Sequence, residues 1–226
     1  MSARLLALET SGDVGSVALL ADGAVSERTI SSPREQTDAV LPHVQGLLAD
    51  AGLELGDLDG IAFGRGPGSF TGLRVATAVA HGFGLTVGLP LLPVSSLAAL
   101  AQGAWRGHGI ERCLVCIDAR MGEVYWAAFE IRDGLANPIG AEKLGSPAAA
   151  RWDALARPWA AVGNGFAAYV AELASLTASA ETVLADVWPA ARDLLPVALE
   201  DLAQGRSCSV EDALPVYLRP ETAWKR

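Results

Sequence analysis

The first half of the chain alternates short apolar runs with helical patterns. Turn residues such as Asp22-Gly23 separate runs that predict five strands. These strands cover residues 4–8, 15–20, 24–30, 58–63 and 91–94. Longer stretches, with apolar residues every three or four positions, predict helices over residues 70–84 and 95–105.

A further helix is predicted after Ser32, which is followed by Pro33 and, three residues on, by Glu35. This is the spacing of a capping box with proline at the first helical position. Its apolar face comprises Val40, Val44, Leu47, Leu48 and Ala51. Gly52 predicts the end of the helix, and Pro42 within the pattern predicts a kink or a later start.

The second half repeats the order of the first. Residues 112–118 form an apolar run that ends in Asp118, as residues 4–8 lead to Glu9, and an apolar run over residues 123–131 follows a glycine turn. Later helices are predicted over residues 146–156, 166–173 and 189–204. We interpret the repeat as a weak internal duplication of a β-β-β-α unit in an α/β fold.

Two such halves resemble the actin-like and Hsp70-like (ASKHA) superfamily, in which two hairpin turns hold a nucleotide between the halves. The domains expected from this resemblance are residues 1–108 and 109–226, with the C-terminal segment as a candidate to cross back to the first half.

Composition narrows the classes of function. The chain has 226 residues and a net charge of −9, and a strongly acidic protein is a poor stand-alone binder of nucleic acid. Its three cysteines predict a reducing, cytoplasmic location. The stretch between Arg74 and Arg106 has no formal charge, but glycines and prolines interrupt it, so no membrane span is expected.

The loop from Gly64 to Gly72 reads GRGPGSFTG and lies between a predicted strand and a predicted helix. Such a loop can bind phosphate or let two backbones approach closely. It lacks the lysine of a P-loop, Ser69 replaces the third glycine of the dinucleotide fingerprint, and Pro67 has no N–H for an anion. A structural turn is therefore favoured, with phosphate binding as the alternative.

The two hairpin turns carry the acids that the superfamily places at a nucleotide. We interpret these acids as turn caps, or as remains of a degenerate nucleotide turn. The residues of that turn are Glu9, Thr10, Ser11 and Asp118. Arg120 and Met121 stand where phosphate would need bare backbone. A nucleotide-binding ATPase or kinase that uses the cleft between the halves is the alternative function.

The sequence predicts neither a metal site nor a cofactor nor a catalytic residue. The three histidines, His43, His81 and His108, include no i, i+4 pair. Cys113 and Cys116 lie in mid-strand without a second pair, which is typical of core cysteines.

Small residues recur every four positions after the glycine loop, at Gly72, Ala76, Ala80 and Gly84, and no Asp or Glu occurs from residue 60 to residue 110. Such a stripe lets another element approach to about 8 Å, either within its own domain or from a partner. Arg74 and His81 would suit the carboxylates of a partner.

Several motifs together resemble the bacterial TsaB family, also called YeaZ-like, over almost the whole chain. The motifs are Glu9-Thr10-Ser11, Pro33-Arg34-Glu35 leading to Leu41-Pro42, the loop of residues 64–72 followed by Leu73-Arg74, and residues 117–125, 215–219 and 223–225.

The resemblance implies a non-catalytic dimerisation subunit. TsaB-like proteins pair with a metal-containing catalytic paralogue, TsaD. With a TsaE-type ATPase they support N6-threonylcarbamoyladenosine formation next to the anticodon of tRNAs that read codons beginning with A. Ser96 and Leu100 stand where the paralogue has metal-binding histidines and cannot form that site.

The resemblance also implies a homodimer when the paralogue is absent, and tRNA contact only within the complex. A minor basic edge for tRNA is expected from Arg65, Arg106, Arg219, Lys225 and Arg226. The expected partner interface comprises Pro33, Arg34, Val40, Leu41, Val44, Phe70, Thr71, Arg74, Val75, Ala78, Val79, His81 and Gly82.

Overall fold

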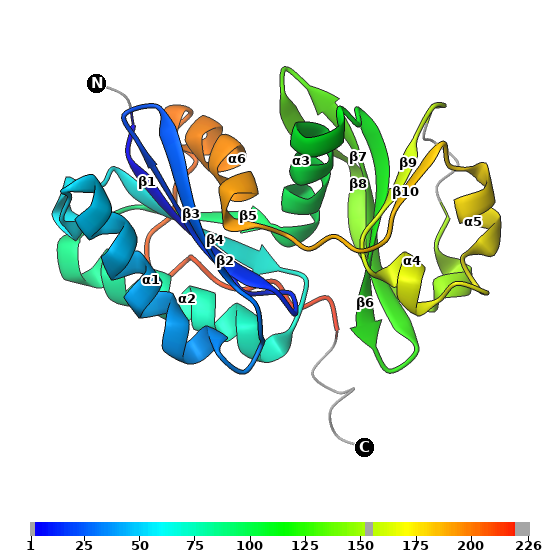
Figure 1. Ribbon diagram of the computed structural model, residues 1–226, viewed down its shortest axis with the longest axis horizontal. Helices are drawn as coiled ribbons and strands as arrows, with labels where there is room; N and C mark the ends of the chain where they lie inside the picture. The colour runs from blue at the N-terminus through cyan, green and yellow to red at the C-terminus, as the bar shows by residue number, and fades with distance from the viewer. Residues whose placement is uncertain (1–2, 152–155, 220–226) are drawn as a thin grey trace. The chain divides into compact units, whose positions relative to one another are not determined.

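The computed structural model describes residues 3–151 and 156–219. The chain forms two compact units (Figure 1). The first comprises residues 1–99 and 189–215, and the second comprises residues 100–188 and 216–226. The division thus falls after residue 99, within a helix, whereas the sequence placed it after residue 108.

The first unit contains a five-stranded sheet in the order β3-β2-β1-β4-β5. Its strands are β1 (Leu5–Glu9), β2 (Gly15–Ala21), β3 (Ala24–Ile30), β4 (Gly60–Gly66) and β5 (Leu91–Ser95). The strands β1, β2 and β3 pair antiparallel, whereas β4 and β5 are parallel to β1. The central strand β1 places Leu8 between Val17 of β2 and Phe63 of β4.

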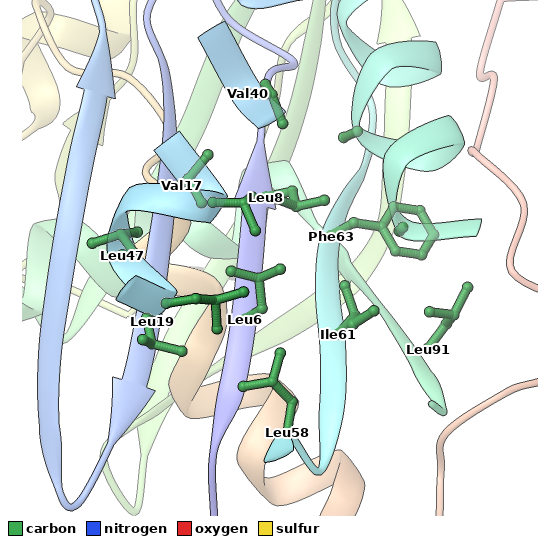
Figure 2. Packing of buried hydrophobic residues seen from close by; sticks show 14 of the residues in the cluster. Leu6, Leu8, Val17, Leu19, Val40, Leu47, Leu58, Ile61, Phe63 and Leu91 are labelled. Atoms are coloured by element: carbon green, nitrogen blue, oxygen red, sulfur yellow. The ribbon is translucent and has the colours of Figure 1, made fainter. Parts of the chain in front are cut away.

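Helices cover both faces of this sheet (Figure 1). The helices α1 (Gln36–Ala51) and α2 (Phe70–Val87) pack on one face, and α6 (Ala191–Ala203) packs on the other. Figure 2 shows Leu6 and Leu8 of β1 beside Val40 and Leu47 of α1. Alternate residues of β1 therefore enter two separate cores, which explains why the strand is apolar throughout.

The second unit repeats this topology in a sheet of order β10-β9-β6-β7-β8. Its strands are β6 (Arg112–Arg120), β7 (Glu123–Arg132), β8 (Leu135–Gly145), β9 (Ala160–Val162) and β10 (Thr182–Leu184). The first three pair antiparallel, and β9 and β10 are parallel to β6, as β4 and β5 are to β1. The predicted duplication is confirmed, and the chain has the duplicated actin-like fold.

The helices differ from expectation at several boundaries. The helix α1 begins at Gln36, and Glu35 occupies its N-cap position without a side-chain bond, so the predicted capping box at Ser32 is wrong. A turn closed by the Glu35 N–H and the Ser32 carbonyl precedes the helix instead. Pro42 lies within α1, and Gly52 ends it in the left-handed conformation with φ 64°, as predicted.

The predicted helices of the second half are shorter than expected, the last one least, since α6 covers residues 191–203 of the predicted 189–204. The described part of residues 146–156 contains only the 3₁₀ turn η2 (Pro147–Ala149), and a similar turn, η1 (Leu55–Asp57), precedes β4. In the stretch 166–173 the helix α4 (Gly165–Ala168) ends early, because Tyr169 leaves the helical region at φ −128°, and α5 (Ala174–Ser179) begins only after this stretch. The helix α3 (Ser96–His108) matches its prediction, apart from a longer C-terminal end. Within the described ranges, no helix combines the length and apolarity needed to cross a bilayer.

Candidate functional site

The small-residue stripe of α2 faces the first unit's own sheet. All four of its members, Gly72, Ala76, Ala80 and Gly84, are buried. The Thr10 hydroxyl donates a 2.6 Å hydrogen bond to the Gly72 carbonyl, and a Cβ at residue 72 would overlap the Thr10 carbonyl oxygen. The stripe therefore serves the close approach of α2 to β1, and it is not itself a surface for a partner.

The opposite side of α2 is exposed and is also repeated every four residues, at Phe70, Arg74, Ala78 and Gly82. The Phe70 side chain is 40% exposed, and the Arg74 guanidinium lies 3.8 Å from the centre of its ring. This cation–π contact fixes a positive charge above an apolar surface. Thr71 is exposed beside it.

The helix α1, which contacts α2, also exposes one large apolar side chain. Leu41 is 45% exposed, whereas Val40 and Val44 are buried against the sheet. The expected interface was therefore wrong for Val40 and Val44, because they occupy the inward face of α1. Pro33 and Arg34 are exposed just before the helix.

Of the residues expected at the partner interface, we call those that are exposed or half-buried, apart from His81, the outer helix face. Its members are Pro33, Arg34, Leu41, Phe70, Thr71, Arg74, Val75, Ala78, Val79 and Gly82, of which Val75 and Val79 are half-buried. Sequence reasoning missed Leu85, which is 68% exposed on the last turns of α2. Its exposure could have been inferred from its position, because it follows Ala78 and Gly82 along the helix at spacings of four and three.

His81 has a structural partner of its own. Its Nε2 lies 2.7 Å from the Ala213 carbonyl oxygen, which can only accept, so this nitrogen carries the hydrogen. Residues 208–213 run beside α2, since Val210 contacts Gly84 and Cys208 pairs with Leu91 of β5. His81 thus holds a C-terminal segment against the helix and is only half exposed.

The first hairpin turn is part of the core. Glu9 and Thr10 are fully buried, and Ser11 is 4% exposed. The Glu9 carboxyl accepts hydrogen bonds from the Ser11 N–H (2.6 Å) and the Ser96 hydroxyl (2.9 Å), and it lies against Gly64, where a Cβ would collide with it. Burial raises the pKa of Glu9. The Glu9 carboxyl thus accepts hydrogen bonds from groups of its own unit.

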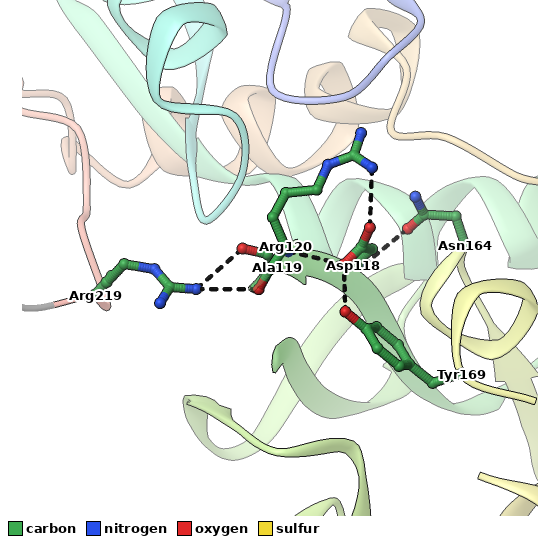
Figure 3. A network of polar contacts seen from close by, with 6 residues as sticks. All are labelled: Asp118, Ala119, Arg120, Asn164, Tyr169 and Arg219. Carbon is green, nitrogen blue, oxygen red and sulfur yellow. Dashed lines mark hydrogen bonds and ion pairs between the residues drawn. The ribbon is translucent and has the colours of Figure 1, made fainter. Parts of the chain in front are cut away.

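The acid of the second hairpin turn is likewise engaged (Figure 3). The Asp118 carboxylate accepts from the Arg120 N–H (2.8 Å) and the Tyr169 hydroxyl (3.0 Å), and it pairs with the Arg120 guanidinium at 3.1 Å. The Asp118 N–H donates to Asn164 at 3.0 Å. Burial and the Asp118 carboxylate raise the pKa of Tyr169. A phosphate-bound cation would have to compete with Arg120 for the Asp118 carboxylate.

Arg219 fixes the backbone of the same turn. Arg120 and Met121 have positive φ angles of 62° and 58°, which side chains other than glycine rarely adopt. The Arg219 guanidinium donates to the carbonyls of Ala119 (3.0 Å) and Arg120 (3.4 Å), pairs with Glu123, and is buried. Arg219 was therefore wrongly expected at an exposed basic edge, while Lys225 and Arg226 lie outside the described residues.

The remaining candidates for chemistry are inert in their surroundings. Cys113 and Cys116 are buried in β6, and burial raises the pKa of each thiol to about 12. In the part of the chain that the structure describes, no three His, Cys, Asp or Glu residues are grouped so as to hold a metal ion. Ser96 donates to Glu9, and Leu100 is buried.

Comparison with known proteins gives consistent matches over nearly the whole chain. A family model described as "TsaD: tRNA N6-adenosine threonylcarbamoyltransferase" matches residues 26–219. The tRNA threonylcarbamoyladenosine biosynthesis protein TsaB of Escherichia coli (strain K12) is 43% identical over 230 residues, which cover 99% of this chain and 97% of that protein. The protein of the same name from Haemophilus influenzae is 36% identical, with coverage of 98% and 96%. The solved structure of YeaZ from Pseudomonas aeruginosa superposes with a TM-score of 0.91 at 40% identity, covering 96% of this chain and all of that one.

Proposed function

This chain belongs to the bacterial TsaB/YeaZ family, and from that premise we propose that it is a non-catalytic dimerisation subunit in tRNA threonylcarbamoyladenosine biosynthesis. Its partner is a metal-containing TsaD paralogue, which performs the chemistry. The product is N6-threonylcarbamoyladenosine next to the anticodon of tRNAs that read codons beginning with A.

The observation that carries this proposal is the outer helix face. Leu41 and Phe70 expose apolar area on two adjacent helices. Ala78 and Gly82 have small side chains, so the surface at the middle of α2 protrudes little. Arg74 supplies a positive charge above the Phe70 ring. The helix α2 contains no carboxylate. A low apolar centre with an aromatic and an arginine is typical of the core of a protein interface. A stable complex through this face should bury more than about 1,000 Å².

The state of the two turn acids supports a role without catalysis. Glu9 is buried among donors of its own unit, and Asp118 is bonded to Arg120 and Tyr169. An ATPase or kinase would need such acids to be free for a metal-bound phosphate. We therefore place the TsaE-type ATPase and the tRNA with the assembled complex, and we assign the same outer helix face to a homodimer when the paralogue is absent.

The test is the substitution Ala78→Arg, with Ala178→Arg as its matched control. Both alanines are exposed on helices, but Ala178 lies on α5 of the second unit and is not a member of the outer helix face. Ala78→Arg places a long charged side chain at the low centre of the face, so binding to the TsaD paralogue should weaken at least about tenfold. The control should co-elute with the paralogue as the unaltered chain does.

Thermal unfolding of the isolated variants separates binding from folding. Both should unfold within about 1 kcal/mol of the unaltered protein, because exposed helix positions tolerate arginine. Full co-elution of Ala78→Arg with the paralogue would reject the outer helix face as the interface.

A further inference from the structure

We propose that the first hairpin turn, residues 10–14 between β1 and β2, positions the two helices that carry the outer helix face. The turn is bonded to the start of α1 and, separately, to the start of α2. Gln36 is the positioning residue on α1, and Gly72 is the point of attachment on α2. The inference rests on the proposed function, because it concerns how the outer helix face is held ready for its partner.

The attachment of α1 is made by the Gln36 side chain. Gln36 is the first residue of α1 and is only 2% exposed. Its Nε2 donates a 2.9 Å hydrogen bond to the Gly12 carbonyl of the turn. The same side chain lies against Gly15 at the start of β2, where an added Cβ would be 3.1 Å from Nε2. Since Glu35, at the N-cap position, makes no side-chain capping bond, Gln36 fixes the place of this helix end.

The attachment of α2 has two hydrogen bonds. The Thr10 hydroxyl donates to the Gly72 carbonyl at 2.6 Å, and the Ser69 N–H donates to the Ser11 carbonyl at 2.7 Å. Ser69 is the N-cap residue of α2, and its side chain accepts from the Gly72 N–H. The turn therefore holds α2 both at its N-cap and within its first turn.

The two attachments lie together in the interior of the first unit. A Cβ at residue 72 would lie 3.4 Å from Oε1 of Gln36, besides overlapping the Thr10 carbonyl oxygen. Thr10 and Gln36 are both buried. A shift of either helix start would leave a buried polar side chain without its partner, which costs more than the bond itself contributes. The turn thus locks the two helix starts to each other.

Most of the outer helix face is carried close to these attachments. Phe70, Thr71 and Arg74 lie in the first two turns of α2, and Leu41 lies in the second turn of α1. A rotation at either helix start would move these side chains away from the arrangement in which both helices meet one partner. The apparent affinity falls in proportion to the fraction of molecules that keep the competent arrangement.

This role also accounts for a motif that the function had not used. The resemblance to the ASKHA superfamily places Glu9, Thr10 and Ser11 at a nucleotide. Here the Thr10 hydroxyl and the carbonyls of Ser11 and Gly12 are bonded to the starts of the two helices. The polar groups of the turn therefore orient a protein-binding surface.

The experiment compares variants that remove an attachment with variants that only loosen packing. Thr10→Val keeps the shape of the side chain but cannot donate to Gly72, whereas Thr10→Ser keeps the hydroxyl and loses a methyl group. Gln36→Met keeps the length of the side chain but cannot donate to Gly12. Val94→Ala is the matched control, because Val94 is buried in the core on the other face of the same sheet.

Binding to the TsaD paralogue is measured by calorimetry at a temperature at which circular dichroism shows every variant to be folded. Thr10→Val and Gln36→Met should each bind about fivefold more weakly, as expected when about one molecule in five keeps both helix starts in place. Thr10→Ser and Val94→Ala should change the affinity by less than about twofold.

Amide hydrogen exchange of the free chain gives a second readout that needs no partner. Thr10→Val should speed exchange of the amides of residues 73–76 at least about tenfold, and Gln36→Met should do the same for residues 39–43, because local opening of these helix starts becomes easier. Val94→Ala should produce no such local increase.

Three outcomes would overturn the inference: normal binding by Thr10→Val and Gln36→Met, equal loss of affinity in Thr10→Val and Thr10→Ser, or unchanged exchange at the helix starts. The variant Ala78→Arg keeps this test apart from that of the proposed function. Weak binding by Ala78→Arg together with normal binding by Thr10→Val and Gln36→Met would reject the positioning role alone. Normal binding by Ala78→Arg would reject the outer helix face as the interface.

Discussion

Replacing Gly72 by alanine tests the contact on which the position of α2 depends. In the native chain the Thr10 hydroxyl donates to the Gly72 carbonyl, and both residues are buried. An added Cβ would overlap the Thr10 carbonyl oxygen, far inside the 3.0 Å that real Cβ atoms keep. Both colliding groups are attached to backbone, so no side-chain rotation relieves the overlap.

The expected cost of Gly72→Ala can be estimated from its two components. Overpacking a buried site costs about 1–3 kcal/mol, and the rigid backbone on both sides places this site at the upper end. Separating the two backbones also weakens the Thr10–Gly72 hydrogen bond, which is worth about 1 kcal/mol. The free energy of unfolding should therefore fall by about 4 kcal/mol, and the midpoint of thermal unfolding by about 8–16 °C.

The assay is urea and thermal unfolding of Gly72→Ala beside Gly82→Ala. Gly82 lies on the same helix, but no atom lies within 4 Å of an added Cβ there. Alanine at residue 82 should therefore raise stability by about 0.5–1 kcal/mol through helix propensity. Equal effects of the two substitutions would refute the inward orientation of the small-residue stripe.

Three further predictions concern groups within the two units. Burial raises the pKa of Glu9 above 4.5 in the folded state. The free energy of unfolding of the unaltered protein, relative to that of Glu9→Gln, should therefore be greatest at low pH and fall as the pH rises through the raised pKa. Urea unfolding between pH 4 and pH 8 measures this difference. Arg219→Met should lower the free energy of unfolding by about 2 kcal/mol, because Glu123 and two turn carbonyls lose their partner. Buried Cys113 and Cys116, with pKa values of about 12, should resist a thiol reagent at pH 8 in the native state, whereas half-buried Cys208 reacts first.

Each of these predictions has a contrary result. For Glu9→Gln, a stability difference that stays flat between pH 4 and pH 8 would contradict a raised pKa. Arg206→Met removes an exposed pair with Asp201 and should cost less than 1 kcal/mol; an equal cost for both arginines would count against the buried clamp. Three thiols reacting at one rate would mean that the β6 core opens readily.

The strands of the first half and the internal duplication were predictable because their signals are local. Each apolar run, turn glycine and acid recurs in the second half at the corresponding place, and the sheets share one topology. The short strands β9 and β10 were not predicted, since three residues carry no periodicity and their pairing with β6 is non-local. The break at Tyr169 was missed because its surroundings have an ordinary helical composition.

The candidate site was predictable only in part, because periodicity finds the faces of a helix but does not say which one is covered. In α2 both faces repeat every four residues and both include small side chains, so Ala76 and Ala78 were equivalent until the sheet was placed. The same ambiguity put Val40 and Val44 on the surface. Arg219 was misplaced for another reason: its Glu123 partner is distant in sequence and is brought to it only by tertiary structure.

The tight seating of α2 has a consequence for association. With glycine and alanine against the sheet and Thr10 bonded to Gly72, the helix has no room to slide or roll when its outer side is covered. A surface carried on such an element loses little conformational freedom on docking. Complex formation through it should therefore resemble the meeting of two rigid bodies, with the free chain already in its bound shape.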